Sequence, residues 1–284
     1  MDKTPELPVP RAFTAQSGPQ IIHGTSIGQG TKTVVFLTGL GAPALWWHEL
    51  GGDEGDVNGL LQNPPWQGRP FLAPSLAPFA RVVSYDRAGI GESSPPRSAR
   101  SLDDFLGELE AVLAAAEVAS PVVLAGHSLG GVIALAYARR FPERVAGLVL
   151  LDSSHPDQLA GFAAVTDAER LGAEAEDRRL MAEQYPERPD LDSLLGQGPL
   201  GVGELGELPV IVVSRTVKTG AERPADVTVG DWGYSQAREM VWQRLQAELA
   251  TLSTRAQPIQ LSASGHYVHF DQPQEVAEAM LKLL

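Results

Sequence analysis

The chain has 284 residues, of which 43% are hydrophobic and 20% charged, a composition typical of a globular protein rather than a disordered one. It contains no cysteine, which excludes disulfides, thiolate catalysis and cysteine-ligated metals. A formal net charge of −13 without clustered Lys and Arg argues against a nucleic-acid partner. The sequence has no apolar run of about 18 residues that could span a membrane, and its first residues lack the apolar core of a secretory signal. We therefore expect a cytoplasmic protein with no membrane partner.

Apolar runs typical of buried strands alternate with amphipathic stretches typical of helices. The predicted strands, in chain order, cover residues 11–16 and 21–26, apolar runs within 33–41 and 80–94, residues 122–125, 145–154 and 208–214, and a last run within 258–270. Helices are predicted at residues 101–118, from 129 onward, at 234–252 and at 274–284. This alternation predicts an α/β fold, with a mostly parallel central sheet and helices on both of its faces.

Two segments interrupt the alternation. Residues 42–79 are rich in Gly, Pro and Trp and form an insertion between two predicted strands. Residues 155–207 contain a few short helical patterns, with 12 acidic residues against 4 arginines. We interpret residues 155–207 as a small helical cap with a solvated acidic face, inserted in a core formed by residues 1–154 and 208–284.

One serine stands between two glycines where a predicted strand meets a predicted helix, in the sequence GHSLG. Ser128 follows the strand at residues 122–125, and Gly126 and Gly130 flank it. A turn this sharp requires a strained serine backbone that displays Oγ, and side chains at the two glycine positions would collide where strand and helix cross. The N–H groups of the following helix favour a developing oxyanion. The pattern predicts a nucleophile elbow.

The chain resembles the α/β-hydrolase superfamily over nearly its whole length. The matching stretches are LTGLG (37–41), YDRAGIGES (85–93), AGHSLGG (125–131), LVLLDSSHP (148–156) and SASGHYVHFDQP (262–273). The resemblance implies the α/β-hydrolase fold and the branch that cleaves esters, lactones and amides. Other branches have Asp at the elbow, which Ser128 argues against. The family usually has His-Gly where this chain has Thr38-Gly39, a change that leaves the backbone N–H donors in place.

A serine hydroxyl needs a base, and the resemblance places the catalytic histidine at His266, after the last strand. His269 is expected to pack or to support the site, because the pair His266/His269 lacks a third ligand for a metal. His127, inside the elbow, and His155, just past a strand end, lie near the expected site without an assigned role.

Acyl transfer also requires N–H donors for the tetrahedral oxyanion. One is expected at the backbone of Leu129, and the resemblance places the second at Leu40, although the glycines beside Leu40 could also form a simple structural turn. Trp46, Trp47 and Trp66 could wall an apolar substrate pocket or could form the core of their own insertion.

The acid that orients the histidine is predicted at an unusual position. Most of the family has it after the strand that follows the cap, but no carboxylate follows residues 208–214 directly. Asp152 ends the preceding strand, and a buried aspartate there needs a partner such as an imidazole N–H. The alternatives are that Asp152 caps a turn through Ser153 and Ser154, and that Asp226 is the acid.

The expected function is that of a serine hydrolase without cofactor or metal, cleaving a small, mostly apolar ester, lactone or related acyl compound. The catalytic triad would be Ser128, His266 and Asp152, with an acyl-enzyme on Ser128. The same residues could serve a lyase, a C–C hydrolase or a perhydrolase, and a catalytically silent sensor of a small ligand is a further alternative. The sequence leaves the oligomeric state open.

Overall fold

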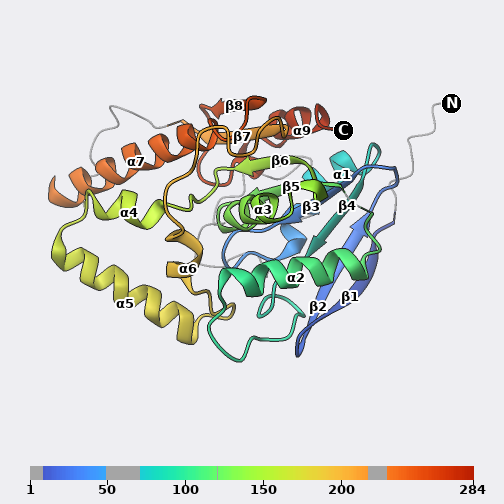
Figure 1. Cartoon of the computed structure of the whole chain (residues 1–284), viewed down its shortest axis with the longest axis horizontal. Helices are drawn as coiled ribbons and strands as arrows, with labels where there is room; N and C mark the ends of the chain where they lie inside the picture. Colours follow the sequence, from blue (N-terminus) through green and yellow to red (C-terminus); the bar gives the residue numbers. More distant parts are fainter. Residues whose placement is uncertain (1–8, 49–70, 120, 217–228) are drawn as a thin grey trace.

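The computed structural model describes residues 9–48, 71–119, 121–216 and 229–284, and for residues 229–232 only the backbone. Within these residues eight strands form one sheet, in the order β1-β2-β4-β3-β5-β6-β7-β8 (Figure 1). The strands are β1 (Arg11–Ser17), β2 (Gln20–Ile27), β3 (Thr33–Leu37), β4 (Arg81–Tyr85), β5 (Val122–His127), β6 (Val145–Leu151), β7 (Val210–Arg215) and β8 (Ala256–Leu261). Strands β3 to β8 run parallel to one another, β2 is antiparallel to its neighbours β1 and β4, and β1 therefore runs in the same direction as β3 to β8.

The strands at the centre of the sheet are buried on both faces, because apolar side chains alternate between two helical layers. Val35 and Leu37 of β3 belong to the core cluster that includes α2 and α3. Val34 and Phe36 belong to the opposite cluster, which includes α1 and α9. Each such fully buried side chain contributes roughly 1.5–3 kcal/mol through removal of apolar surface from water. The continuous apolar run at β3 is therefore explained by burial of the strand on both faces of the sheet.

The helices lie on both faces of the sheet. They are α1 (Leu72–Leu76), α2 (Leu102–Ala115), α3 (Leu129–Arg140), α4 (Gln158–Ala163), α5 (Ala168–Gln184), α6 (Leu191–Leu195), α7 (Val229–Leu249), α8 (Val268–Asp271) and α9 (Pro273–Leu281), with 3-10 turns η1 (Ala44–Trp47) and η2 (Pro142–Arg144). Ser101 is the N-cap of helix α2 and forms a capping box with Asp104. The predicted fold class, with its mostly parallel sheet between helical layers, is confirmed.

The segment between β6 and β7, residues 155–207, is called the insertion from here on. It carries α4, α5 and α6, and Figure 1 shows α5 at the edge of the molecule beyond α4 and α6. Helix α5 has no buried side chain, as expected for a solvated acidic face. Helix α4 packs on α7 through Phe162 and Trp242. The division of the chain into a core and a cap stays a prediction.

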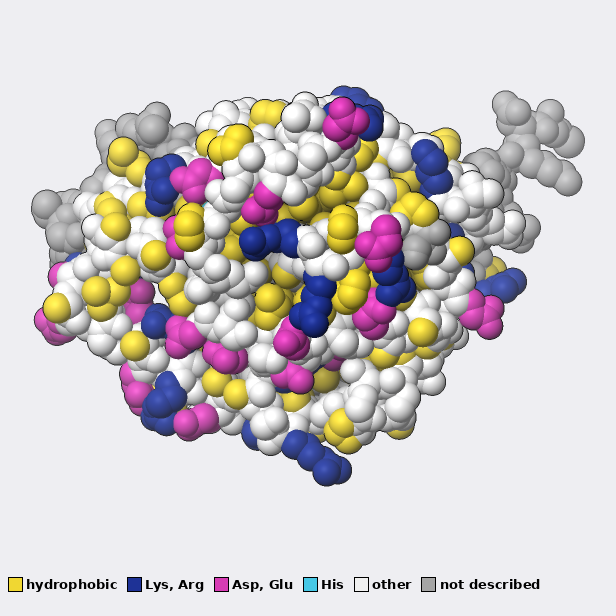
Figure 2. Space-filling model, in the orientation of Figure 1, with side chains coloured by type: hydrophobic (Ala, Val, Ile, Leu, Met, Phe, Trp, Pro, Cys, Tyr) yellow, Lys and Arg dark blue, Asp and Glu magenta, His cyan; other side chains and the backbone are white. Residues whose placement is uncertain are grey.

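The surface shows mixed charge. On the face drawn in Figure 2, acidic and basic side chains lie among hydrophobic ones, and Lys and Arg are scattered rather than gathered. Within the described residues, no helix has the length and hydrophobicity required to cross a bilayer.

Sequence patterns did not predict the short helices that lie outside residues 155–207. The Gly-, Pro- and Trp-rich segment of residues 42–79 contains η1 and α1 in its described parts, and α8 follows the last strand. Helices this short carry too few residues for a helical period to emerge.

Candidate active site

Ser128 stands at a sharp turn between β5 and α3. Its φ of 50° and ψ of −119° are unusual for a residue other than glycine, and such a conformation costs of order 1–3 kcal/mol. Its backbone is fixed by the neighbouring strand end, since Ser128 N donates to Leu151 O at 3.2 Å and Ser154 N donates to Ser128 O at 3.0 Å. The backbone strain expected from the sequence is therefore present at this serine.

The glycines around Ser128 are required by close backbone contacts. A Cβ atom on Gly126 would lie 2.3 Å from Gly130 O, and one on Gly130 would lie 2.2 Å from Leu37 O. Real Cβ atoms do not approach backbone oxygens this closely, because the overlap is too repulsive. The GHSLG motif thus has the steric basis that the sequence predicted.

Asp152 and His266 are joined by a hydrogen bond at the carboxyl ends of the strands. The distance between His266 Nδ1 and Asp152 Oδ2 is 2.6 Å, and Asp152 is completely buried. Because a carboxylate accepts, the imidazole proton sits on Nδ1 and Nε2 is left as the basic nitrogen. Asp152 follows β6, which pairs directly with β5, so the acid lies beside the strand that carries Ser128.

The other hydrogen bonds of Asp152 come from elements that are distant in sequence. Trp242 Nε1 donates to Oδ1 at 3.1 Å, Arg215 N donates to Oδ1 at 3.3 Å, and the Arg215 guanidinium donates to Oδ2. These contacts, rather than a turn through the serines that follow, account for the carboxylate oxygens. Arg215 ends β7, where the family usually has its acid. Asp226, the reserve candidate, lies outside the described residues.

Two further histidines lie beside His266 and are held neutral. His127 Nε2 is 3.0 Å from His266 O, and its ring centroid is 4.7 Å from that of His269. Burial lowers the pKa of His127 well below its usual range, and His266 and His269 lower it further. Burial also lowers the pKa of His269 to about 3, with a smaller effect from His266. Neither imidazole therefore adds a positive charge near His266 at neutral pH.

The two predicted oxyanion donors lie in elements that meet at Ser128. Leu129 is the first residue of α3. Leu40 belongs to the loop after β3, which we call the oxyanion loop (residues 38–41). A Cβ atom on Gly39 would lie 2.8 Å from His127 Nδ1 and 3.5 Å from Ser128 Cβ, so this loop passes directly over the elbow.

Trp46 and Trp47, two of the three tryptophans predicted for the substrate pocket, are buried. Trp47 is 1% exposed and stacks on Phe36, with ring centroids 4.4 Å apart, which favours its role in the core. Trp46 packs edge-to-face on Tyr267 and Phe270, at 5.9 and 5.7 Å between ring centroids. Tyr267 is half-buried and follows His266, so it connects Trp46 with the histidine. Contact between Trp46 and a substrate stays a prediction, and Trp66 lies outside the described residues.

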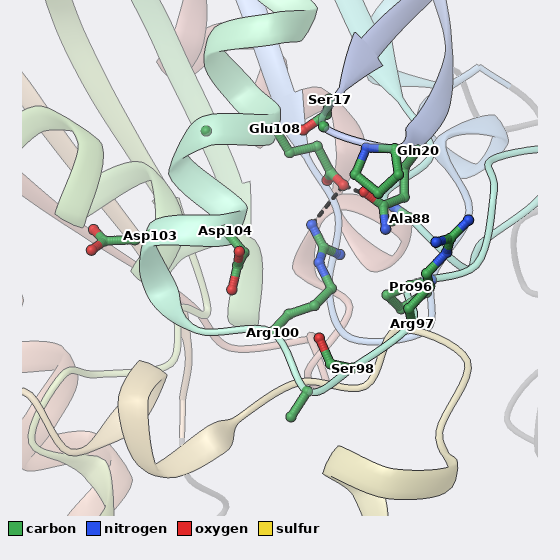
Figure 3. Close-up of a pocket in the computed structure, with 14 residues that line it drawn as sticks. Ser17, Gln20, Ala88, Pro96, Arg97, Ser98, Arg100, Asp103, Asp104 and Glu108 are labelled. Atoms are coloured by element: carbon green, nitrogen blue, oxygen red, sulfur yellow. Dashed lines mark hydrogen bonds and ion pairs between the residues drawn. The ribbon is translucent and has the colours of Figure 1, made fainter.

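A separate polar pocket of about 330 Å³ lies where the β1–β2 turn, the loop before α2 and α2 itself meet. Figure 3 shows Arg100 and Glu108 pointing toward each other there, and they form a buried ion pair at 2.6 Å. Within the described part of the chain, no group of three or more His, Asp or Glu side chains could hold a metal ion.

Comparison with known proteins places the chain in a family. A family model described as the alpha/beta hydrolase fold matches residues 32–257. The chain belongs to the α/β-hydrolase fold family. It is 28% identical over 249 residues to the uncharacterized protein YqjL of Bacillus subtilis, covering 87% of this chain and 81% of that protein. It is 35% identical over 129 residues to a 2-hydroxymuconate semialdehyde hydrolase of Pseudomonas sp., covering 45% of this chain and 42% of the relative.

Solved structures agree with this assignment at the level of the fold. A serine hydrolase involved in carbazole degradation, the CarC enzyme, aligns with a TM-score of 0.62 at 16% identity, covering 97% of this chain and 98% of that one.

Two residues that contact Asp152, Arg215 and Trp242, were not predicted from the sequence. Arg215 had a signal, because a cation stands where the family usually has an anion, directly beside the predicted acid. Trp242 had none, since its contact joins segments that are 90 residues apart in the sequence.

Proposed function

We propose that this α/β-hydrolase is a cofactor-free serine hydrolase that cleaves a small, mostly apolar and neutral ester, lactone or related acyl compound through an acyl-enzyme on Ser128. The observation that carries the proposal is the 2.6 Å hydrogen bond between the buried Asp152 and His266, next to the strained elbow of Ser128. A base oriented by a buried acid beside a displayed hydroxyl is the arrangement that nucleophilic catalysis requires.

In the proposed reaction, Ser128 Oγ attacks the substrate carbonyl carbon while its proton moves to Nε2 of His266. The carbonyl oxygen becomes an oxyanion, stabilised by the N–H groups of Leu40 and Leu129. The tetrahedral intermediate expels the alcohol, which takes the proton back from His266. Water then attacks the acyl group by the same route, and Ser128 is released.

Charge near the triad supports a neutral substrate. Asp152 and Glu239 both bond the single guanidinium of Arg215, so this cluster has a net charge of −1 while His266 is neutral. An anionic substrate would be repelled by this cluster and by the acidic insertion, over the 8–10 Å that electrostatic interactions reach at physiological salt.

The test is the turnover of a panel of p-nitrophenyl esters together with labelling by a fluorophosphonate. We expect a single label on Ser128, and a loss of turnover and labelling in Ser128→Ala, because the activated nucleophile is removed. Ser262→Ala, an exposed serine near His266 in sequence, is the matched control and should keep both. Labelling that persists in Ser128→Ala would show that another residue is the nucleophile.

C–C bond hydrolysis is the second candidate, because the 35% identical stretch belongs to a 2-hydroxymuconate semialdehyde hydrolase. Turnover of a vinylogous 1,5-diketone without turnover of any ester would favour it. Tight binding of an ester or of the diketone, with turnover of neither, would favour a catalytically silent sensor.

A further inference from the structure

A buried ion pair joins the core of the molecule to the insertion. Arg87, in the loop after β4, is 1% exposed, and Glu187, in the insertion after α5, is 0% exposed. The guanidinium binds the carboxylate with two hydrogen bonds, Nε to Oε2 at 2.6 Å and Nη2 to Oε1 at 3.0 Å. Desolvation offsets most of the attraction in such a pair, so a buried pair is weak evidence for a role in stability alone.

Both partners also bind the backbone of the oxyanion loop. Arg87 Nη2 donates to Gly39 O at 2.6 Å, and Nη1 donates to Thr38 O at 2.6 Å. On the other side of Leu40, Gly41 N donates to Glu187 Oε1 at 2.6 Å. The two peptide groups that flank Leu40 are therefore each fixed by one member of the pair.

This fixes the direction of the Leu40 N–H. In a planar trans peptide the C=O and the N–H point in opposite directions. The Gly39–Leu40 peptide directs its C=O to Arg87, so its N–H must point away from Arg87. The Leu40–Gly41 peptide directs its N–H to Glu187, so neither peptide beside Leu40 can rotate without losing a hydrogen bond.

The insertion reaches the oxyanion loop because two glycines leave room for it. A Cβ atom on Gly41, which has a φ of 72°, would lie 2.0 Å from Tyr185 Oη. A Cβ atom on Gly89, which has a φ of 92°, would lie 2.0 Å from Pro186 O. The segment around Glu187 thus packs against both loops at van der Waals distance.

Backbone hydrogen bonds to Arg100 also hold the segment that follows Glu187. Arg100 N donates to Arg188 O at 2.8 Å, and Asp190 N donates to Arg100 O at 2.9 Å. Arg100 is in turn fixed by Glu108, the pair shown in Figure 3. Because backbone bonds follow Glu187 on the chain and a packed tyrosine precedes it, its carboxylate has little freedom to move.

We propose that Glu187 is a positioning residue for the oxyanion hole: with Arg87 it orients the peptides on both sides of Leu40, so that the Leu40 N–H donates to the developing oxyanion only while the insertion is docked. This rests on the proposed hydrolase function. It adds a residue of the insertion that acts through the loop without touching the substrate.

Glu187→Gln tests the proposal with an ester that the wild-type protein hydrolyses. The amide NH2 would face the donors of Arg87, so the pair would separate and the loop would lose its fixed orientation. We expect kcat to fall about 10- to 100-fold, less than or equal to the loss of a whole oxyanion donor, with KM changed less than about threefold. Affinity for a trifluoromethyl ketone, which forms a tetrahedral oxyanion adduct with Ser128, should fall by the same factor as kcat/KM.

Glu183→Gln is the matched control, because it makes the same change at an exposed glutamate of the insertion that pairs with Arg179. It should behave as wild type. A second variant, Arg87→Met/Glu187→Leu, removes both charges, which often leaves stability unchanged. This double variant should fold, and its kcat should be reduced as much as that of Glu187→Gln.

The proposal is overturned if the folded variants keep wild-type kcat and wild-type affinity for the ketone. It is also overturned if both variants fail to fold, since the pair would then serve the fold alone. If the wild-type protein itself hydrolyses no ester, or Ser128→Ala is as active as wild type, it is the proposed function that fails.

Discussion

Asp152 shows how a single carboxylate can be held in a buried position. Its oxygens accept hydrogen bonds from His266, Trp242 and Arg215, which come from three different parts of the chain. Its own φ of 39° is unusual, so the backbone is strained where the acid is presented. Strain and multiple partners together indicate that the position of this side chain, not only its presence, matters.

We therefore expect Asp152→Asn to fold and to lose about 10³- to 10⁴-fold in kcat, since the amide favours the wrong tautomer of His266. Ester turnover and circular dichroism measure the two outcomes. Asp103→Asn, on the exposed surface of α2, is the matched control and should be unchanged. An active Asp152→Asn with an inactive Asp226→Asn would instead assign the acid to the later position.

At the scale of elements, two helices use glycine in opposite ways. In α2, a Cβ atom on Gly107 would meet no atom within 4 Å. In α3, a Cβ atom on Gly130 would lie 2.2 Å from Leu37 O and 2.5 Å from Thr38 O. Only the second glycine is required by packing, because α3 begins directly against the end of β3.

Gly107→Ala should therefore raise the free energy of unfolding by about 0.5–1 kcal/mol, because alanine loses less backbone entropy in a helix. Gly130→Ala should lower it by about 1–3 kcal/mol through overpacking, and should slow the turnover of an ester that the wild-type protein hydrolyses, because the added methyl group displaces residues 38–41. Urea denaturation of the two variants and of the wild-type protein measures the sign of each change in the free energy of unfolding. A stabilised Gly130→Ala would contradict the steric account of the elbow.

The sequence predicted the strands and the helices that flank the sheet well, but it indicated only short helices where the 17-residue α5 lies, and it predicted the contacts between elements poorly. Apolar runs identified β3, β5 and β6 because strands buried on both faces need continuous hydrophobicity. The elbow was predictable since Gly126, Ser128 and Gly130 are adjacent in the chain. The contact between Asp152 and His266 was predicted across 114 residues because a family motif marks each of them. No matching motif marks Arg215, Trp242 or Glu187, whose partners lie 63, 90 and 100 residues away, respectively.

At the scale of the whole molecule, several buried histidines link folding to pH. Burial lowers the pKa of His155 to about 4 and that of His269 to about 3, from 6.5. Arg244 contributes to the shift at His155, and His266 to that at His269. Because the folded-state pKa values are depressed, the unfolded chain binds more protons between these values and 6.5. Stability from these groups is therefore complete above pH 6.5 and declines as the pH falls.

From pH 7.5 to 5, each of these two histidines should cost about 2 kcal/mol of stability. Acidification also relieves repulsion in a chain with a net charge of −13, so the total slope mixes two opposing effects. The variant His269→Phe isolates the contribution of His269 to this pH dependence, since the new ring can pack on Trp47 and Phe270 as the imidazole does. Its free energy of unfolding, measured by urea denaturation, should fall about 2 kcal/mol less than that of wild type over this range, with ester turnover retained.

The buried pair between Arg87 and Glu187 also constrains recombination of this protein with its relatives. Exchange of the 155–207 segment with that of a relative would change the residues that pack on the loop after β3 while the sheet is kept. A donor segment without a carboxylate at the position of Glu187 would leave the 1%-exposed guanidinium of Arg87 without a counter-ion. Chimeras should therefore be built with Arg87 and its partner inherited together, as one unit that spans two separate stretches of the gene.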